Sequence, residues 1–205
     1  HISHRESFDH PESYSFVEIS QNNHQRGEDQ WNNGLHQIEK LKKAKMLRPL
    51  NNVKTYGNDL GTHGGGTHNG IESFVRSSFF GSAAVRFHRP PSGLGLGDTA
   101  QAVIQGVREA TEQIDFFNAR PNNELLVERE ENEAYCRALP GKDYLVYFPN
   151  AGEVGLKLEQ GGSPVKVKRL ELLSGAWTEV DVEAVDGVVM LLSPGRHYIF
   201  VIQKP

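Results

Sequence analysis

The chain has 205 residues, of which 37% are hydrophobic and 23% charged, with a formal net charge of −4 at pH 7. The slightly acidic balance argues against nucleic-acid binding, and no run of Lys or Arg exceeds two residues. No apolar stretch approaches the ~20 residues of a membrane span, so we expect no membrane partner. The single Cys136 excludes an internal disulfide.

The first 120 residues alternate between short apolar runs and amphipathic segments. Strands are predicted over Ser15–Ile19, Leu50–Tyr56 and Ala83–His88. Apolar residues at helical spacing follow each strand, and helices are expected over Trp31–Met46, Ile71–Phe79 and Asp98–Ile114. Asp98 and Gln101 have the spacing of a capping box, and Trp31 is expected to pack inside its helix interface.

Strand–helix alternation with polar loops after the strands is typical of a (β/α)8 TIM-type barrel. A complete barrel takes about 250 residues. We therefore interpret residues 1–133 as the C-terminal portion of such a barrel. The other barrel strands are expected to come from a missing N-terminal half or from another protein chain, because the open edges of a partial sheet tend to pair with further strands.

After an acidic connecting segment at residues 121–134, apolar residues recur at every second position. Tyr144–Phe148, Trp177–Val182, Val188–Leu192 and Tyr198–Ile202 are among the predicted strands, and turn residues separate them. Regular short strands indicate a small antiparallel β-sandwich over residues 134–205. The fold class is therefore α/β plus all-β. We expect Trp177 in the sandwich core, and Phe116 and Phe117 where the sandwich packs on the barrel.

Three stretches of the chain resemble a known family. They are Asp98–Leu126, the strand ending in Tyr147–Asn150 (YFPN), and Leu172–Trp177 (LLSGAW) before the final strand. Together they resemble the C-terminal half of the apiosidase-like glycoside hydrolases, over roughly residues 14–205. The resemblance implies a (β/α)8 barrel followed by a β-sandwich of the type named collagen-binding. It also implies a secreted, or extracellular or periplasmic, protein that hydrolyses or binds a polysaccharide.

The resemblance makes the three strands barrel strands six, seven and eight. In this family the acid usually follows strand four, and the nucleophile ends strand seven. Strand seven here has no carboxylate, and Lys54 lies near the expected position. Glycoside cleavage normally needs two carboxyl groups about 5–10 Å apart. Two hypotheses follow: hydrolysis that uses another acid, or a non-catalytic extracellular structural or adhesive protein that retains the barrel as a scaffold.

The candidate catalytic residue is Glu18, at the end of the first strand, as an acid, base or nucleophile. The alternative is a buried ion pair with Lys54 or Arg86. The substrate-binding candidates lie on the three predicted strands or in the loops that follow them: Gln21, Asn22, His24, Asn51, Asn52, His63, His68, Arg86 and His88. We expect five of them to converge on one pocket, namely Gln21, Asn22, Asn52, His63 and His88.

Each group of candidates has a structural alternative. The amides suit sugar hydroxyls, but they can also cap loops. Arg86 and His88 are two positions apart on a strand, so their side chains point to the same face. They can hold a sugar carboxylate or orient a catalytic acid, or they can form a salt bridge in the barrel core. His63 and His68 flank a glycine run without an apparent third ligand, so no metal or other cofactor is predicted. A metal-dependent enzyme that uses the His residues is the third hypothesis.

Overall fold

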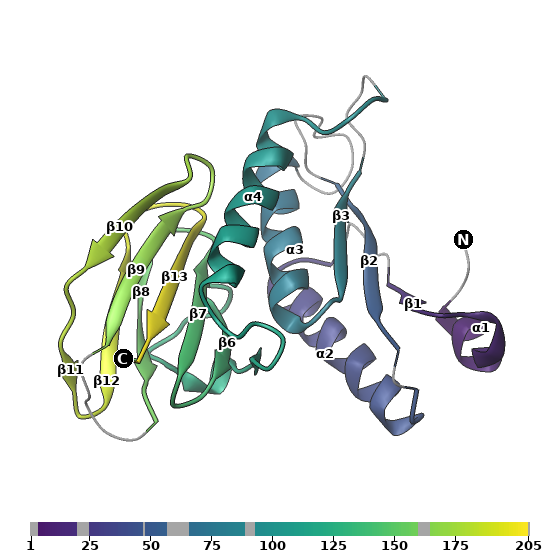
Figure 1. Cartoon of the computed structure of the whole chain (residues 1–205), viewed down its shortest axis with the longest axis horizontal. Helices are drawn as coiled ribbons and strands as arrows, with labels where there is room; N and C mark the ends of the chain where they lie inside the picture. Colours follow the sequence, from purple (N-terminus) through teal and green to yellow (C-terminus); the bar gives the residue numbers. More distant parts are fainter. Residues whose placement is uncertain are drawn as a thin grey trace. The chain divides into compact units, whose positions relative to one another are not determined.

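The computed structural model describes residues 4–19, 25–46, 48–56, 66–88, 93–159 and 165–204. The chain forms two compact units, His1–Ala100 and Gln101–Pro205 (Figure 1). Among the residues that the structure describes, no helix combines the length and the apolar character needed to cross a membrane.

The first unit is built on a parallel sheet of order β1-β2-β3. Its elements are α1 (His4–Asp9), η1 (Pro11–Ser13), β1 (Val17–Glu18), α2 (Gly27–Lys43), β2 (Leu50–Thr55), α3 (Gly66–Phe80) and β3 (Ala84–Phe87), and α4 (Asp98–Glu112) follows. Helices α2 and α3 lie on the same side of the sheet (Figure 1). The prediction of three parallel strands, each followed by a helix, is confirmed.

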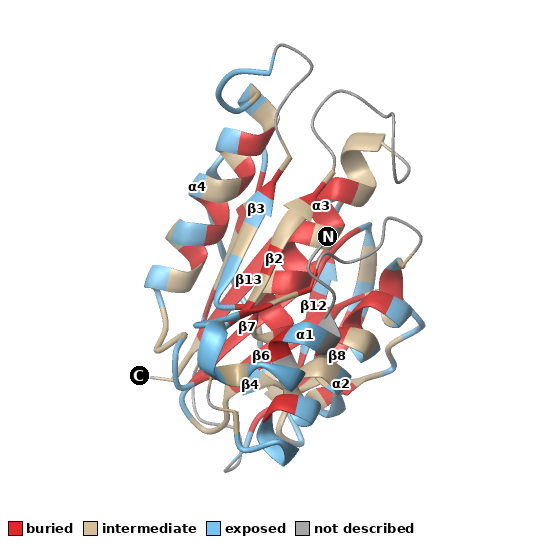
Figure 2. Ribbon diagram, turned by 90° about the vertical axis from the view of Figure 1, so that its right-hand side faces the viewer, coloured by how far each residue is buried: buried red, intermediate tan, exposed pale blue. Residues whose placement is uncertain are grey.

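Apolar side chains between the sheet and these two helices form the core of the first unit. Val17 and Leu50 are buried partners in the sheet, and the Phe87 ring stacks on Phe74 of α3 with centroids 4.5 Å apart. Trp31 of α2 meets Phe80 of α3 edge-on at 6.4 Å, which confirms its packing role. Helix α3 is buried along most of its length (Figure 2).

The second unit contains two antiparallel sheets. Its strands are β4 (Arg120–Pro121), β5 (Leu126–Val127), β6 (Tyr135–Leu139), β7 (Asp143–Phe148), β8 (Gly152–Lys157), β9 (Lys166–Glu171), β10 (Ala176–Val180), β11 (Ala184–Val185), β12 (Val188–Ser193) and β13 (Tyr198–Gln203), with η2 (Asn123–Leu125) between β4 and β5. The sheet orders are β10-β9-β13-β7-β6-β4 and β11-β12-β8-β5. Residues of both sheets share one hydrophobic cluster, in which Val146 and Phe200 come from the first sheet and Leu156 and Leu191 from the second.

The acidic segment expected as a connection belongs to these sheets. Arg120–Pro121 pairs with β6, and Leu126–Val127 pairs with β8. The alternation rule missed both strands because each is only two residues long.

Trp177 does not lie in the core between the sheets, contrary to expectation. It is half-buried on β10, at the edge of the six-stranded sheet, and its Nε1 donates to Glu109 Oε2 of α4 at 3.3 Å. Its partner in the sheet is Leu170, which also faces α4, because a Cβ built at Gly106 would lie 3.5 Å from Leu170. Trp177 therefore belongs to the contact between α4 and the sheet.

By its contacts, α4 belongs to the second unit. A Cβ at Gly106 would lie 2.7 Å from Leu172 Cδ1, which shows how closely the helix approaches the sheet. Gln203 Nε2 donates to the Gln113 carbonyl at 2.6 Å, just beyond the helix. The compact units divide between Ala100 and Gln101, and the two predicted domains, residues 1–133 and 134–205, stay a prediction. An apolar stripe on a helix does not reveal which neighbour it packs against.

Only one of the two phenylalanines after α4 is packed within the second unit. The Arg137 guanidinium lies 4.2 Å from the centroid of the Phe116 ring, and its Nη2 donates to the Phe116 carbonyl at 3.1 Å. Burial lowers the pKa of Arg137 to about 10. Phe117 is 88% exposed. The expected packing of sandwich on barrel stays a prediction.

Candidate functional site

The sheet of the first unit has one face that α2 and α3 do not cover. Glu18 pairs with Asn51, and Asn51 pairs with Ala84, so these three residues form one row across the sheet. Arg86 follows Ala84 by two positions and points to the same face. We call this surface the polar face and define it by Glu18, Asn51, Tyr56, Ala84, Arg86 and His88.

An irregularity in β2 brings Tyr56 to the polar face. The register of β2 and β3 shifts between Asn52 and Thr55. Thr55 and Phe87, which pair beyond the shift, are both buried, and Phe87 packs on α3. The next residues, Tyr56 and His88, therefore point the opposite way, and their rings stack with centroids 4.8 Å apart at 25°.

Two cations lie on the strands that lead to the stacked rings. Lys54 Nζ lies 5.6 Å from the centroid of the Tyr56 ring. Arg86 Nε donates to the Val53 carbonyl at 3.1 Å, which ties the exposed Arg86 side chain to β2. The carboxyl ends of β2 and β3 thus carry an aromatic pair beside positive charge.

Asn51 has an unsatisfied acceptor. Its Oδ1 is buried and, within the described residues, has no hydrogen-bond partner. A buried carbonyl oxygen left without a donor costs about 1–3 kcal/mol and is rare in folded proteins. Its place on the polar face, between Glu18 and Ala84, makes it a candidate to accept a hydrogen bond from a ligand.

Asn52 and His68 lie away from the polar face. The Asn52 side chain is fully buried on the helix side of β2, and its Nδ2 donates to Ser77 Oγ of α3 at 3.0 Å. His68 lies in the first turns of α3, not in a loop, because that helix begins at Gly66. Its Nε2 is 2.8 Å from Glu72 Oε1 on the same helix.

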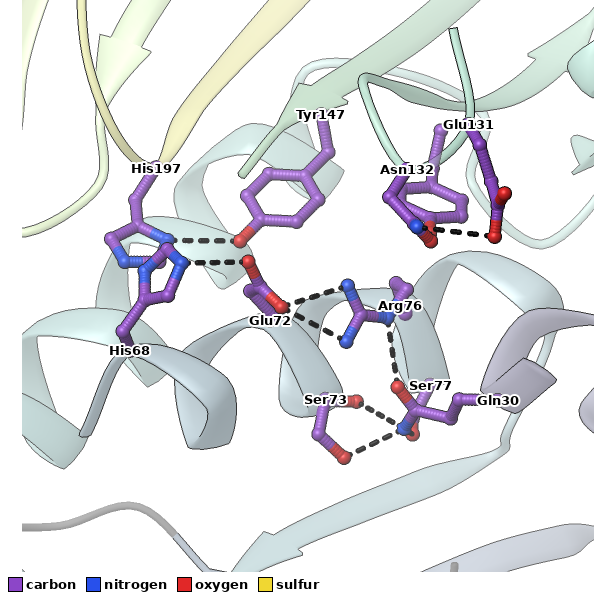
Figure 3. Close-up of polar contacts among 11 residues, drawn as sticks. Gln30, His68, Glu72, Ser73, Arg76, Ser77, Glu131, Asn132, Tyr147 and His197 are labelled. Carbon is purple, nitrogen blue, oxygen red and sulfur yellow. Dashed lines mark hydrogen bonds and ion pairs between the residues drawn. The ribbon is translucent and has the colours of Figure 1, made fainter. Parts of the chain in front are cut away.

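Both residues contact a polar cluster of α2 and α3: Asn52 through Ser77, and His68 through Glu72 as Figure 3 shows. Arg76 is 1% exposed, and its Nη1 and Nη2 lie 3.1 and 3.2 Å from Glu72 Oε2. Arg76 Nε donates to Gln30 Oε1 at 2.8 Å, and Gln30 Nε2 donates to Ser73 Oγ at 2.6 Å. The buried members of the cluster satisfy one another, which fits a structural role for Asn52, while the partly exposed His68 is held by Glu72 on α3, away from the polar face.

The remaining predicted site residues fall into two groups. Gln21, Asn22, His24 and His63 lie outside the described residues, so their convergence with His88 is untested. Within the described part of the chain, no three His, Cys, Asp or Glu side chains are placed to hold a metal ion. Glu18 is the one carboxylate on β1, β2 and β3.

Sequence reasoning missed Tyr56 as a site residue. Strict alternation from Asn52 would place Tyr56 on the helix side, and the register shift reverses this. The Tyr147–His197 pair of the second unit was also missed. Its hydroxyl and Nδ1 are 2.9 Å apart, and both side chains are buried (Figure 3).

Comparison with known proteins shows the fold. No protein-family model matches the chain, and no curated protein matches it. It is similar to a solved structure described as a glycoside hydrolase, with a TM-score of 0.67, 11% identity, and coverage of 93% of this chain and 52% of that one. It is also similar to a glycoside hydrolase family 5 from Bacteroides vulgatus, with a TM-score of 0.69, 13% identity, and coverage of 94% and 51%.

A third structure is the glycoside hydrolase family 30 subfamily 8 xylanase from Clostridium acetobutylicum, with a TM-score of 0.50, 11% identity, and coverage of 80% and 44%. The chain spans about half the length of the first two structures. At these identities the similarity concerns the fold. The chain therefore has a glycoside hydrolase-like fold and corresponds to part of a TIM-barrel-like architecture.

Proposed function

We propose that this chain is the C-terminal part of a glycoside hydrolase-like protein that binds a polysaccharide on the polar face and hydrolyses it. The single observation that carries the proposal is the chemistry of that face. Parallel strands are normally apolar on both faces, because both are covered. Here the face away from α2 and α3 presents a carboxylate, an amide, the Arg86 cation and an aromatic pair, with Lys54 close to the Tyr56 ring.

This chemistry suits a carbohydrate. Sugar hydroxyls donate and accept hydrogen bonds, and the buried Asn51 Oδ1 is an acceptor without a hydrogen-bond donor among the described residues. The stacked Tyr56 and His88 rings offer a flat surface for the apolar face of a sugar ring. The position of Tyr56 and His88 also fits, because they directly follow β2 and β3 and the sites of TIM-type barrels lie at the carboxyl ends of the strands, whereas Asn51 is the second residue of β2.

If the protein hydrolyses glycosidic bonds, Glu18 is either the acid or the nucleophile or base of the reaction. A glycosidase uses an acid and a nucleophile or base, with carboxyl groups about 5–10 Å apart. Glu18 is half-buried on the polar face. The second carboxyl group would come from barrel strands other than β1, β2 and β3, in the part of the architecture that this chain does not cover.

The second candidate function is sugar binding without cleavage, in an extracellular structural or adhesive protein. It is favoured by Lys54, which lies near the end of β2 where the related enzymes are expected to carry their nucleophile. Its ammonium group over the Tyr56 ring fits ligand contact rather than nucleophilic attack on a sugar.

We further propose that the two antiparallel sheets form the β-sandwich that follows the barrel in apiosidase-like enzymes. Their shared hydrophobic cluster supports this, as do the matching stretches at Tyr147–Asn150 and Leu172–Trp177. A secreted, extracellular or periplasmic location goes with a polysaccharide substrate.

The test uses the natural polypeptide that contains this chain and a panel of soluble polysaccharides. Affinity electrophoresis measures binding, and release of reducing ends measures hydrolysis. We expect Tyr56→Ala to weaken binding about tenfold, since one aromatic contact is worth about 1 kcal/mol or more. Glu18→Gln should abolish release while binding is kept. The matched control is Phe117→Ala, an exposed aromatic on the other unit.

The outcomes separate the hypotheses. Binding with release that depends on Glu18 supports the hydrolase. Binding that depends on Tyr56, without release from any polysaccharide, supports the non-catalytic alternative. Equal binding by wild type, Tyr56→Ala and Phe117→Ala would contradict both.

A further inference from the structure

The outer face of the four-stranded sheet exposes apolar side chains. On β12, Val189 and Leu191 point into the shared core, so Val188, Met190 and Leu192 point outward. Met190 is 41% exposed and Leu192 60%. Exposed large apolar residues gathered on one sheet face mark an interaction surface more often than scattered ones.

The neighbouring strand β8 gives this face a charge pattern. Its outward residues are Glu153, Gly155 and Lys157, because Val154 and Leu156 point into the core. Neither the Glu153 carboxylate nor the Lys157 ammonium interacts with another side chain in the described part of the chain. Four residues along a strand separate the two charges by about 13 Å, and Gly155 lies midway.

The register of the two strands makes the pattern symmetric. Gly155 pairs with Met190, Lys157 with Val188, and Glu153 with Leu192. Gly155 has no side chain, and a Cβ there would lie 2.5 Å from Val127 Cγ2 of β5, 2.8 Å from Val188 Cγ1 and 3.3 Å from Met190 Sδ. Side chains of both neighbouring strands therefore cover Gly155, which makes the centre of the face apolar.

We propose that this face binds a second copy of the chain through a two-fold axis that runs across the strands at Gly155 and Met190. Such an axis stacks the two faces with their strands antiparallel. It places Glu153 of each copy opposite Lys157 of the other, Val188 opposite Leu192, and Met190 opposite Met190. Two attractive charge pairs thus flank an apolar centre.

The alternative symmetry is disfavoured by the same charges. A two-fold axis parallel to β8 would place Glu153 opposite Glu153 and Lys157 opposite Lys157, which repel each other. The face also carries no aromatic side chain on β8 or β12, so it lacks the stacking surface that a sugar chain would use. The self-complementary charges therefore favour a second copy as the occupant.

Sedimentation velocity on the natural polypeptide containing this chain tests the proposal, at concentrations up to about 100 µM. We expect a dimer. Glu153→Lys and Lys157→Glu should each weaken it at least about tenfold, because each change replaces two attractive pairs by two repulsive ones. The double variant Glu153→Lys/Lys157→Glu exchanges the charges and should restore the wild-type dimer. Met190→Asp, at the centre, should abolish it.

Cross-linking tests the position of the axis. A short bifunctional maleimide should join two copies of Met190→Cys, because this residue meets itself across the axis. The control Leu192→Cys should not cross-link, since it faces Val188 of the other copy. The native Cys136 is buried and does not interfere.

The proposal is overturned by a monomer at the highest concentration, by association that both single charge reversals leave unchanged, or by failure of the double variant to restore the dimer. Aggregation through open strand edges would show no dependence on these charges. A dimer that cross-links through Leu192→Cys and not through Met190→Cys would also overturn it. None of these outcomes bears on sugar binding by the polar face.

Discussion

Gly106 of α4 offers a quantitative test of which unit this helix belongs to. Replacing glycine by alanine inside a helix normally stabilises a protein by about 1 kcal/mol. Here a Cβ would lie 2.7 Å from Leu172 Cδ1 and 3.1 Å from the Leu172 carbonyl oxygen. Overpacking such a contact costs about 1–3 kcal/mol, and the carbonyl belongs to the backbone and cannot rotate away. We expect Gly106→Ala to lower the free energy of unfolding by about 1 kcal/mol.

Cys136 reports on this unit alone. It is fully buried in the cluster between the two sheets, and burial raises the pKa of its thiol, so it should react only after the unit opens. The assay is thiol labelling as a function of urea concentration. The matched control is Gln105→Ala, an exposed neighbour on the same helix, which should change stability by less than about 0.5 kcal/mol. A Gly106→Ala variant that gains about 1 kcal/mol would refute the packing of α4 on this sheet.

Three further predictions concern other parts of the chain. Arg76→Ala should lower the stability of the first unit by about 3 kcal/mol in urea unfolding followed by the fluorescence of Trp31, with Trp177 replaced by phenylalanine, because it leaves the largely buried Glu72 carboxylate with His68 as its remaining ion-pair partner. Arg108→Ala, which breaks an exposed pair with Glu112, should leave the midpoint unchanged, and equal effects of the two variants would contradict a structural role for Arg76. Native Cys136 should resist thiol labelling for hours without urea, and rapid labelling would mean that the second unit opens readily. Expressed alone, residues 1–205 should aggregate or unfold without a sharp transition, since β1 and β3 end the described parallel sheet; a soluble monomer with a sharp thermal transition would contradict this.

Local patterns predicted the three strands of the first unit and the helices that follow them, but not α1 and η1. Strand–helix alternation gave three parallel strands within a few residues of their bounds, and the apolar spacing around Trp31 matched its packing on Phe80. These features are local, because the hydrophobic period depends only on neighbouring residues. The similarity to glycoside hydrolase structures agrees with the fold that the sequence suggested.

The site residues were harder to predict because they depend on which face a strand residue takes. Asn51 and Asn52 are neighbours in sequence, yet one reaches the polar face and the other is buried against Ser77. The register shift in β2 then turns Tyr56 to the polar face, and no residue pattern marks such a shift. His68 was assigned to a loop because three glycines precede it, although α3 begins at Gly66.

Contacts between residues far apart in the sequence were the least predictable. The apolar stripe of α4 is clear in the sequence, but its packing on Leu172 depends on a residue far along the chain. Trp177, which follows a turn, was expected in the sandwich core, whereas its indole donates to Glu109 at the margin of the sheet. Tertiary contacts of this kind follow from the arrangement of whole elements, which local periodicity does not encode.

The affinity of an Asn51→Leu variant for the polysaccharide that wild type binds best tests the central claim most directly. Leucine has nearly the same shape and removes the unsatisfied Oδ1 acceptor. We predict binding at least about tenfold weaker, because one hydrogen bond to the ligand is lost, and a thermal midpoint equal to or above that of wild type, because an unsatisfied buried group is removed. Unchanged affinity in this variant would contradict a sugar-binding polar face.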